Sequence, residues 1–225
     1  MFKRHYGNFG RRMLRKELLK IGIEVSESKI SKILKENHLK SKYGRKKCKN
    51  VYTSNNTEKY VQDNLFAKLS KDEQTKLEIW SIDFSEIILK NKKYYLCGIV
   101  SVNSKISISL TMSKSQTKEI AYETIRQGIE RYGKPDMLMS DRGCQFTSKL
   151  IHDYLEKEGI KHSMSRPHRP VDNRFIETFW KTLKIEIGKI GQYEKETFEK
   201  VLEYYQHYYN YERPHSTLGY MTPIR

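Results

Sequence analysis

The feature that most constrains the fold is a change of hydrophobic pattern near residue 77. Polar, basic sequence gives way there to segments rich in β-branched and aromatic residues, at 77–89, 94–102 and 106–112. The short polar stretches NKK and NSK separate these segments and are typical of tight turns. Strands joined by such short turns pair with their sequence neighbours, so we predict a three-stranded antiparallel meander.

Beyond the meander, helical and strand patterns alternate. Helices are expected at 117–132, 148–159, 169–186 and within 193–212, with two short strands at 136–140 and 160–164. Glycines at positions 133 and 159 stop the first two of these helices. The sequence therefore predicts an α/β fold, a mixed five-stranded sheet with helices on both faces.

Two further short helices are expected before residue 40. Residues 9–20 carry apolar side chains at helical spacing, and Ser26 is a plausible N-cap of a second helix, with Val25 packed on Ile30. The residues expected to face the first helix are Ile30, Ile33 and Leu34. Two helices joined by a tight turn fit a small all-α helix-turn-helix module, although many helical hairpins share this pattern.

Positive charge is concentrated in the same module. Residues 1–50 hold 16 Lys and Arg but only 4 Asp and Glu, and so supply +12 of the net +16 of the chain. Such a concentration predicts a polyanionic partner, most often nucleic acid. The candidate DNA contacts are Lys29, Lys32, Arg11 and Arg12. A basic tail that only improves solubility is the alternative.

We expect three parts in the chain: a basic module over 1–48, a polar linker over 49–74 and the sheet-forming domain over 75–225. No apolar run approaches the roughly 20 residues of a membrane span, and the first residues lack the apolar core of a signal peptide. The three cysteines, Cys48, Cys97 and Cys144, have no CxxC spacing. They favour a reducing compartment and argue against a zinc site or a disulfide framework.

Three carboxylates stand in unusual contexts. Asp83 lies inside the first expected strand, Asp141 follows the strand at 136–140, and Glu177 lies among the apolar residues of a helix. Each has a structural alternative: Asp83 paired with a buried cation, Asp141 capping a turn, Glu177 exposed beside Lys181. Three acids delivered to one end of a sheet would repel one another, and a divalent cation would remove that repulsion. Oxygen-only ligation favours Mg²⁺ or Mn²⁺ over zinc.

The contexts of these acids carry a specific resemblance. The segments are WSIDFS, SDRGCQFTS, SMSRPHRPVDNRFIETFWKTLKIE and YYNYERPHSTLGYMTP. With them the chain resembles the catalytic subunit of IS3-family insertion-sequence transposases, within the DDE transposase and retroviral integrase superfamily. Thirty-five residues separate Asp141 from Glu177, the interval of the superfamily's D-35-E motif, and Lys184 matches its trailing basic residue. The resemblance runs from about residue 5 to the end.

The resemblance implies an RNase H-like core in which Asp83, Asp141 and Glu177 form the catalytic and metal-binding triad, with two Mg²⁺ ions. It implies cleavage and joining of DNA strands at terminal inverted repeats. The implied partners are double-stranded DNA, further copies of this chain and the DNA-binding product of an overlapping upstream frame. It also implies a bacterial cytoplasmic protein associated with the nucleoid.

Basic residues around the third acid are candidates for holding DNA phosphates. Lys181 and Lys184 follow Glu177 within two helical turns, on about the same face. Arg166 and Arg169 lie in the loop before that helix. For Lys181, a surface ion pair is the alternative.

Other motif residues are expected to act structurally. Asp172 and Asn173 are expected to cap the helix that carries the third acid. Asn210, Arg213 and His215 are expected mainly to pack the last helix and loop against the core.

Three functions remain open from the sequence. The first is a DNA strand-transferase, which the presence of all three acids favours. The second is a DNA-binding regulator that descends from a transposase and uses its basic helices without chemistry. The third is an RNase H-like nuclease that cuts without joining.

Overall fold

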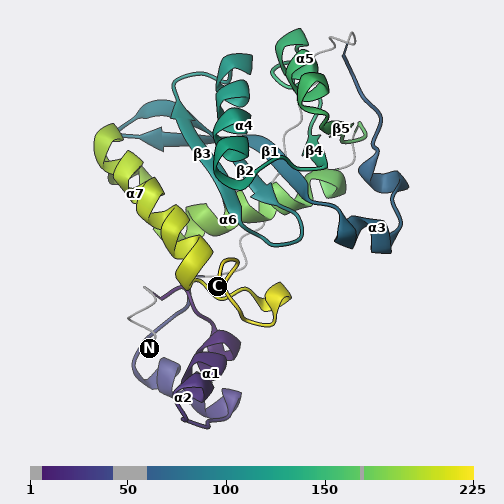
Figure 1. Cartoon of the computed structure of the whole chain (residues 1–225). Helices are drawn as coiled ribbons and strands as arrows, with labels where there is room; N and C mark the ends of the chain where they lie inside the picture. The colour runs from purple at the N-terminus through teal and green to yellow at the C-terminus, as the bar shows by residue number, and fades with distance from the viewer. Residues whose placement is uncertain (1–6, 43–59, 168–169) are drawn as a thin grey trace.

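A five-stranded mixed sheet forms the centre of the computed structural model, which describes residues 7–42, 60–167 and 170–225 (Figure 1). The strands are β1 (Ile79–Leu89), β2 (Lys92–Ser101), β3 (Ser107–Ser113), β4 (Met137–Ser140) and β5 (Lys161–Met164). Their order is β3-β2-β1-β4-β5. The first three strands pair antiparallel, whereas β4 joins β1 and β5 joins β4 in parallel. The predicted meander and mixed sheet are confirmed.

Helices cover both faces of the sheet. One face packs on α4 (Lys118–Tyr132) and α5 (Lys149–Glu158). The other packs on α6 (Arg174–Ile187) and α7 (Lys195–His207). Side chains of β1 alternate between the two cores: Ile82 and Phe84 belong to the α4 side, Ile87 and Leu89 to the α6 side. The same alternation assigns Asp83 to the face covered by α6.

The last expected helix changes character before it ends. After α7 the chain forms a π-helical turn over Tyr208–Glu212. Short 3-10 turns follow the other helices or precede them, at Pro170–Asn173, Ile190–Gln192 and Ser216–Leu218. These turns connect regular elements without long loops.

Gly98 is required where α6 crosses β2. It pairs with Asp83 in the sheet register. A Cβ atom at Gly98 would lie 2.6 Å from Cη2 of Trp180 and 2.9 Å from Cδ2 of Leu110, so only glycine admits the indole ring here. The close approach fixes Trp180 beside the strand that carries Asp83.

The amino-terminal module consists of α1 (Arg11–Lys20) and α2 (Glu27–Glu36) around Phe9, Leu14 and Ile30. Ser26 caps α2 as predicted, because its hydroxyl accepts the N–H of Lys29 at 3.2 Å. The prediction for Ile33 is wrong. Its side chain is 45% exposed, because Ile30 and Leu34, one turn apart, already form the buried stripe of this short helix.

The described part of the segment expected to be a linker packs against the sheet domain. Residues 60–74 include a 3-10 turn at Phe66–Lys68, and α3 (Lys71–Lys76) follows the N-cap residue Ser70. The N–H of Phe66 donates to the Ser163 hydroxyl at 3.0 Å. Leu65, Phe66 and Leu69 lie against Ile79 and Met137. This stretch therefore covers the open edge near β5.

In the described residues no helix is long and apolar enough to cross a membrane. Cys97 is buried and Cys144 exposed, and neither forms a disulfide. Cys48 lies outside the described residues, as does Arg169.

Candidate active site

The sheet register brings two of the three acids together. Ser81 of β1 lies beside Met139 of β4 in a parallel pair. The β1–β4 pairs end there, and two residues beyond them Asp83 and Asp141 lie close enough for the charge of Asp141 to raise the pKa of Asp83. Asp141 also holds the turn that follows β4, since its Oδ1 accepts the N–H of Gly143 at 2.9 Å. The turn-capping alternative is therefore real, but it leaves Asp141 at the sheet edge.

Glu177 approaches this edge from α6. The helix buries Ile176, Phe179 and Trp180, while Glu177 itself stays exposed. Its carboxylate has neither a hydrogen bond nor an ion pair within the described part of the chain, so the pair with Lys181 is not formed there. Partial burial of the carboxyl against the sheet nevertheless raises the pKa of Glu177 above its ordinary value.

The charges of Asp141 and Glu177 both act on Asp83. Burial is the main cause that raises the pKa of Asp83 to about 8, and the negative charges of Asp141 and then Glu177 add to it. Burial likewise raises the pKa of Asp141. No lysine or arginine forms an ion pair with Asp83 among the described residues, which removes the salt-bridge alternative for that part of the chain. The acids share one electrostatic environment that disfavours their charged forms.

Trp180 is a further site residue, which the sequence analysis did not single out. Its indole Nε1 is buried and has no hydrogen-bond partner among the described residues. The indole nevertheless lies close enough to the Asp83 carboxyl to lower its pKa, against the effect of burial. A buried indole N–H normally finds a hydrogen-bond partner. The presence of a tryptophan three residues after Glu177 was therefore the sequence signal that could have identified Trp180 as a site residue.

The side chains of the site are of the type that binds a hard divalent cation, but they are not close enough together to share one. Among the described residues no three His, Cys, Asp or Glu side chains are arranged closely enough to hold a metal ion. The acids of the site are carboxylates only, the ligand type that Mg²⁺ and Mn²⁺ prefer. A cation would also offset the burial and repulsion that raise their pKa values.

The basic residues around α6 differ in how freely they can bind DNA. Lys181 is exposed. Lys184 donates from Nζ to the Glu86 carbonyl at 2.9 Å, and burial lowers its pKa, while the charges of Glu86 and Asp83 oppose that effect. Lys184 is thus tied to β1 within electrostatic reach of Asp83.

Arg166 is occupied by an acid. Its Nε and Nη2 contact the two carboxylate oxygens of Asp172 at 3.0 and 2.9 Å. The hydrogen bond from Arg166 is the main cause that lowers the pKa of Asp172 to about 2. Asn64 also donates to Asp172, at 2.6 Å. The guanidinium therefore holds the loop before α6 together.

The predicted capping of α6 by Asp172 and Asn173 is wrong. Asn173 occupies the N-cap position, but its side chain makes no capping hydrogen bond. Its φ of −106° and ψ of 12° continue the preceding 3-10 turn instead of the extended geometry that side-chain capping needs. The Asn173 amide oxygen accepts instead from the Ser81 hydroxyl, at 3.3 Å.

The residues near the carboxyl end pack as expected. Asn210 exchanges two hydrogen bonds with the backbone of Ser107, at 2.8 and 3.0 Å. Arg213 contacts the buried carboxylate of Glu186 at 2.9 Å. His215 stays neutral, because burial and the charge of Arg213 lower its pKa to about 3.

On the amino-terminal module, the four candidate DNA contacts are exposed but not equally free. Arg11 and Arg12 approach Glu27 at 3.1 and 3.8 Å. Lys32 approaches Glu36 at 3.9 Å, while Lys29 makes no ion pair in the described structure. Exposed pairs of this kind are weak and can exchange for a phosphate.

Comparison with known proteins identifies the domains. Residues 73–170 match the model of the integrase core domain, and residues 158–223 match a second integrase core model. Residues 1–47 match an HTH-like domain. The two integrase matches overlap over residues 158–170, around β5 and the loop before α6, and together they cover Asp83, Asp141 and Glu177.

Relatives match over nearly the whole chain. The transposase for insertion sequence element IS904 of Lactococcus lactis is 27% identical over 99% of this chain and 88% of its own length. A protein of insertion element IS600 from Shigella sonnei is 30% identical over 96% and 79%. In fold, a chain of the simian T-cell lymphotropic virus intasome is similar with a TM-score of 0.57 and 21% identity, over 65% of this chain and 52% of that one. The sheet order, the integrase and HTH-like matches and the IS600 relative agree: the chain belongs to the insertion-sequence transposases with an RNase H-like integrase core, of the IS3-family type.

Proposed function

We propose that this chain cleaves and joins DNA strands at the terminal inverted repeats of an insertion sequence, with Asp83, Asp141 and Glu177 as its catalytic residues. One observation carries the proposal. Carboxylates from the end of β4 and from α6 lie within electrostatic reach of Asp83 in β1, and burial together with their negative charges raises the pKa of Asp83 to about 8. Structural acids are normally paired, so this arrangement favours a catalytic role.

The reaction is a pair of phosphoryl transfers. A water oxygen bonds to phosphorus while the bond to the 3′ oxygen breaks, which releases a 3′-hydroxyl at the element end. That hydroxyl then attacks a second phosphodiester and displaces its 3′ oxygen, which joins two strands. Neither transfer needs a covalent link to the protein.

The three acids would hold Mg²⁺ or Mn²⁺, in two positions. When bound, the ions would supply charge that activates the attacking oxygen and stabilises the leaving oxygen. Trp180 would donate its N–H to the ionised Asp83 carboxylate and hold it in place. Glu177, which has no partner in the described structure, is free to turn toward the two aspartates.

DNA is the proposed partner along two surfaces. Lys181 and Lys184 on α6 would contact phosphates beside the acids, and Arg169 before α6 remains a candidate. Lys29 and Lys32 of α2, with Arg11 and Arg12, would form the second surface, on a module of residues 1–48. The proposed catalytic domain spans 75–225.

Assembly is part of the proposal. Joining two element ends requires both to be held at once, which favours several copies of this chain on DNA. The DNA-binding product of an upstream frame is a further proposed partner.

A cleavage and joining assay tests the proposed chemistry. Duplexes that carry the inverted repeats flanking the gene are incubated with Mg²⁺ and either the wild-type protein or the Glu177→Gln variant. The amide keeps the shape of the side chain but cannot carry its charge. We expect nicked and joined products from the wild type only, with the same thermal unfolding for both proteins. Equal product from the variant would refute the catalytic assignment.

A DNA-binding regulator without chemistry is the second candidate. It is favoured by the basic amino-terminal module, where residues 1–50 supply +12 of the net charge of +16 and residues 1–47 match an HTH-like domain. A regulator would bind the repeats without nicking them at any concentration of Mg²⁺ or Mn²⁺. The third candidate, a nuclease, would give nicked DNA but no joined strands.

A further inference from the structure

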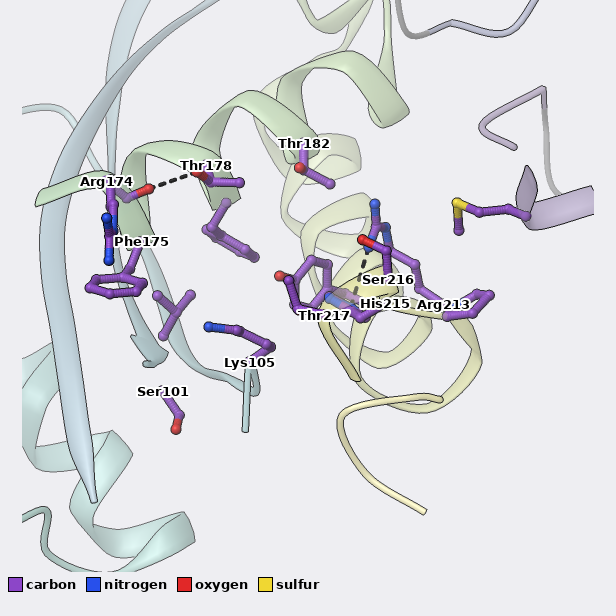
Figure 2. Close-up of a pocket in the computed structure, with 15 residues that line it drawn as sticks. Ser101, Lys105, Arg174, Phe175, Thr178, Thr182, Arg213, His215, Ser216 and Thr217 are labelled. Carbon is purple, nitrogen blue, oxygen red and sulfur yellow. Dashed lines mark hydrogen bonds between the residues drawn. The ribbon is translucent and has the colours of Figure 1, made fainter. Parts of the chain in front are cut away.

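We propose that a cavity beside the amino-terminal half of α6 is a further DNA contact, a binding site for a backbone phosphate. Its volume is about 350 Å³. It lies between α6, the turn after β2 and the segment that follows α7, and Figure 2 shows side chains from all three around it. This inference rests on the proposed function, because it takes DNA as the substrate.

Two cations of the cavity flank one aromatic ring. Lys105 Nζ lies 5.2 Å and the Arg174 guanidinium carbon 4.9 Å from the ring centre of Phe175. Neither cation forms an ion pair within the described residues, and no Asp or Glu side chain is among the residues that line the cavity. Aromatic contact stabilises a cation but leaves its charge uncompensated.

The local field is positive. Burial and the charge of Arg174 lower the pKa of Lys105. The charges of Arg213 and Lys105 contribute to the lowered pKa of His215, which lines the cavity. Arg213 is already compensated by the buried Glu186, so Lys105 and Arg174 are the cations that an anion would neutralise.

Lys105 keeps its position against a backbone preference. Its φ of 63° lies in the left-handed region, which is unfavourable for a residue other than glycine. Its ammonium group is also held by a hydrogen bond to the carbonyl of Val102. A turn that needs only this backbone geometry would be more stable with glycine or asparagine. We therefore expect the lysine side chain to make an interaction that offsets the unfavourable backbone geometry.

The other groups of the cavity suit a phosphodiester. Hydroxyl groups line it, from Thr178, Thr182, Ser216 and Thr217. Arginine binds phosphate oxygens through paired N–H groups, and Phe175 offers an apolar surface to a sugar or base. Arg174 precedes Glu177 by three residues, so the two side chains are neighbours on α6 and a phosphate held here would lie near the acids.

Binding without chemistry tests this inference. Duplex DNA is titrated by fluorescence anisotropy in the absence of divalent cations, so the result does not depend on catalysis. The Lys105→Gln/Arg174→Gln variant is compared with Lys118→Gln/Arg131→Gln, which removes the same charge from α4 on the opposite face. We expect affinity to fall on the order of tenfold for the first variant, and its salt slope to fall by about 1, with a much smaller change for the control.

Equal weakening by the two variants would overturn the proposal, since it would show a general charge effect. A parallel titration with dATP and with inorganic phosphate separates DNA from free anions. If the cavity variant loses binding to these but keeps its affinity for DNA, the site serves a free nucleotide or phosphate and the proposal is wrong. If the double variant does not fold, Thr217→Glu at the exposed rim replaces it, with the same expected loss of affinity for DNA.

Discussion

The two halves of α6 each carry a glutamate, and the two glutamates differ in burial and in their partners. In the second half, Glu186 is buried, contacts Arg213 at 2.9 Å and accepts the Tyr205 hydroxyl at 3.0 Å. In the first half, Glu177 is exposed and has no hydrogen bond or ion pair within the described structure. The difference separates an acid that stabilises the fold from one that is free to bind something else.

The same contrast holds for the neighbours of each glutamate. Arg213 joins the segment after α7 to α6 through Glu186, and Lys42 reaches the Glu186 carbonyl at 2.8 Å. At the other end of the helix, the negative charges of Asp141 and Glu177 raise the pKa of Asp83. The carboxyl-terminal end of α6 therefore stabilises the domain, while its amino-terminal end places the carboxylate of Glu177 within electrostatic reach of Asp83.

The largest expected effect comes from breaking the paired end. Arg213→Met leaves the Glu186 carboxylate buried without its cation, and should lower the free energy of unfolding by about 3–5 kcal/mol. Chemical denaturation monitored by circular dichroism measures it. Glu177→Gln is the comparison, with an expected change near zero.

A second substitution sharpens this result. Adding Glu186→Leu to Arg213→Met removes the stranded charge and should restore much of the lost stability. If the double variant is no more stable than Arg213→Met alone, the ion pair is not what Glu186 contributes.

The next expected effect is a pH dependence of stability, which arises from Asp83 beside the amino-terminal end of α6. Between the ordinary aspartate pKa of 3.8 and about 8, folded Asp83 keeps a proton that the unfolded chain releases. Without divalent cations, the stability of the wild type should therefore fall as pH rises through this window. Thermal unfolding across the window measures it.

Asp83→Asn should remove that part of the decline, while the exposed Asp72→Asn should not. Adding Mg²⁺ at pH 8 should raise the unfolding temperature of the wild type more than that of Asp83→Asn. Parallel profiles for the wild type and Asp83→Asn would mean that the carboxyl is ordinarily charged in the folded state.

The smallest expected effect tests the indole at the acidic end. Trp180→Phe keeps an aromatic ring at this position of α6 but removes the N–H that would hold ionised Asp83, together with the indole atoms nearest Gly98. We expect Mg²⁺ affinity, measured by titration calorimetry, to fall by about threefold to tenfold.

Trp80→Phe is the matched control, because that indole donates to Glu78 at 2.9 Å and packs on the other face of the sheet. Equal Mg²⁺ affinity in wild type and Trp180→Phe would leave Trp180 a packing residue only. Gly98→Ala should instead lower stability, by about 1–3 kcal/mol, because its Cβ collides with the ring.

The sequence by itself determined the order of elements and the identity of the three acids. Alternation over 77–89 was enough for β1, and the glycines at 133 and 159 end α4 and α5 as expected. The motif spacing singled out Asp83, Asp141 and Glu177. Hydrophobic period and turn residues are local signals, because they depend only on near neighbours in the chain, whereas the motif interval is a separation along the chain that needs no structure to count.

The tertiary structure alone decided which distant groups meet. It joined Arg166 to Asp172, Arg213 to Glu186 and the Trp180 ring to Gly98, and it brought Lys105 to Phe175. Each of these contacts depends on strand register and on the path of α6 across the sheet. Periodicity shows which face of an element is buried, but not which residue of a remote element covers it.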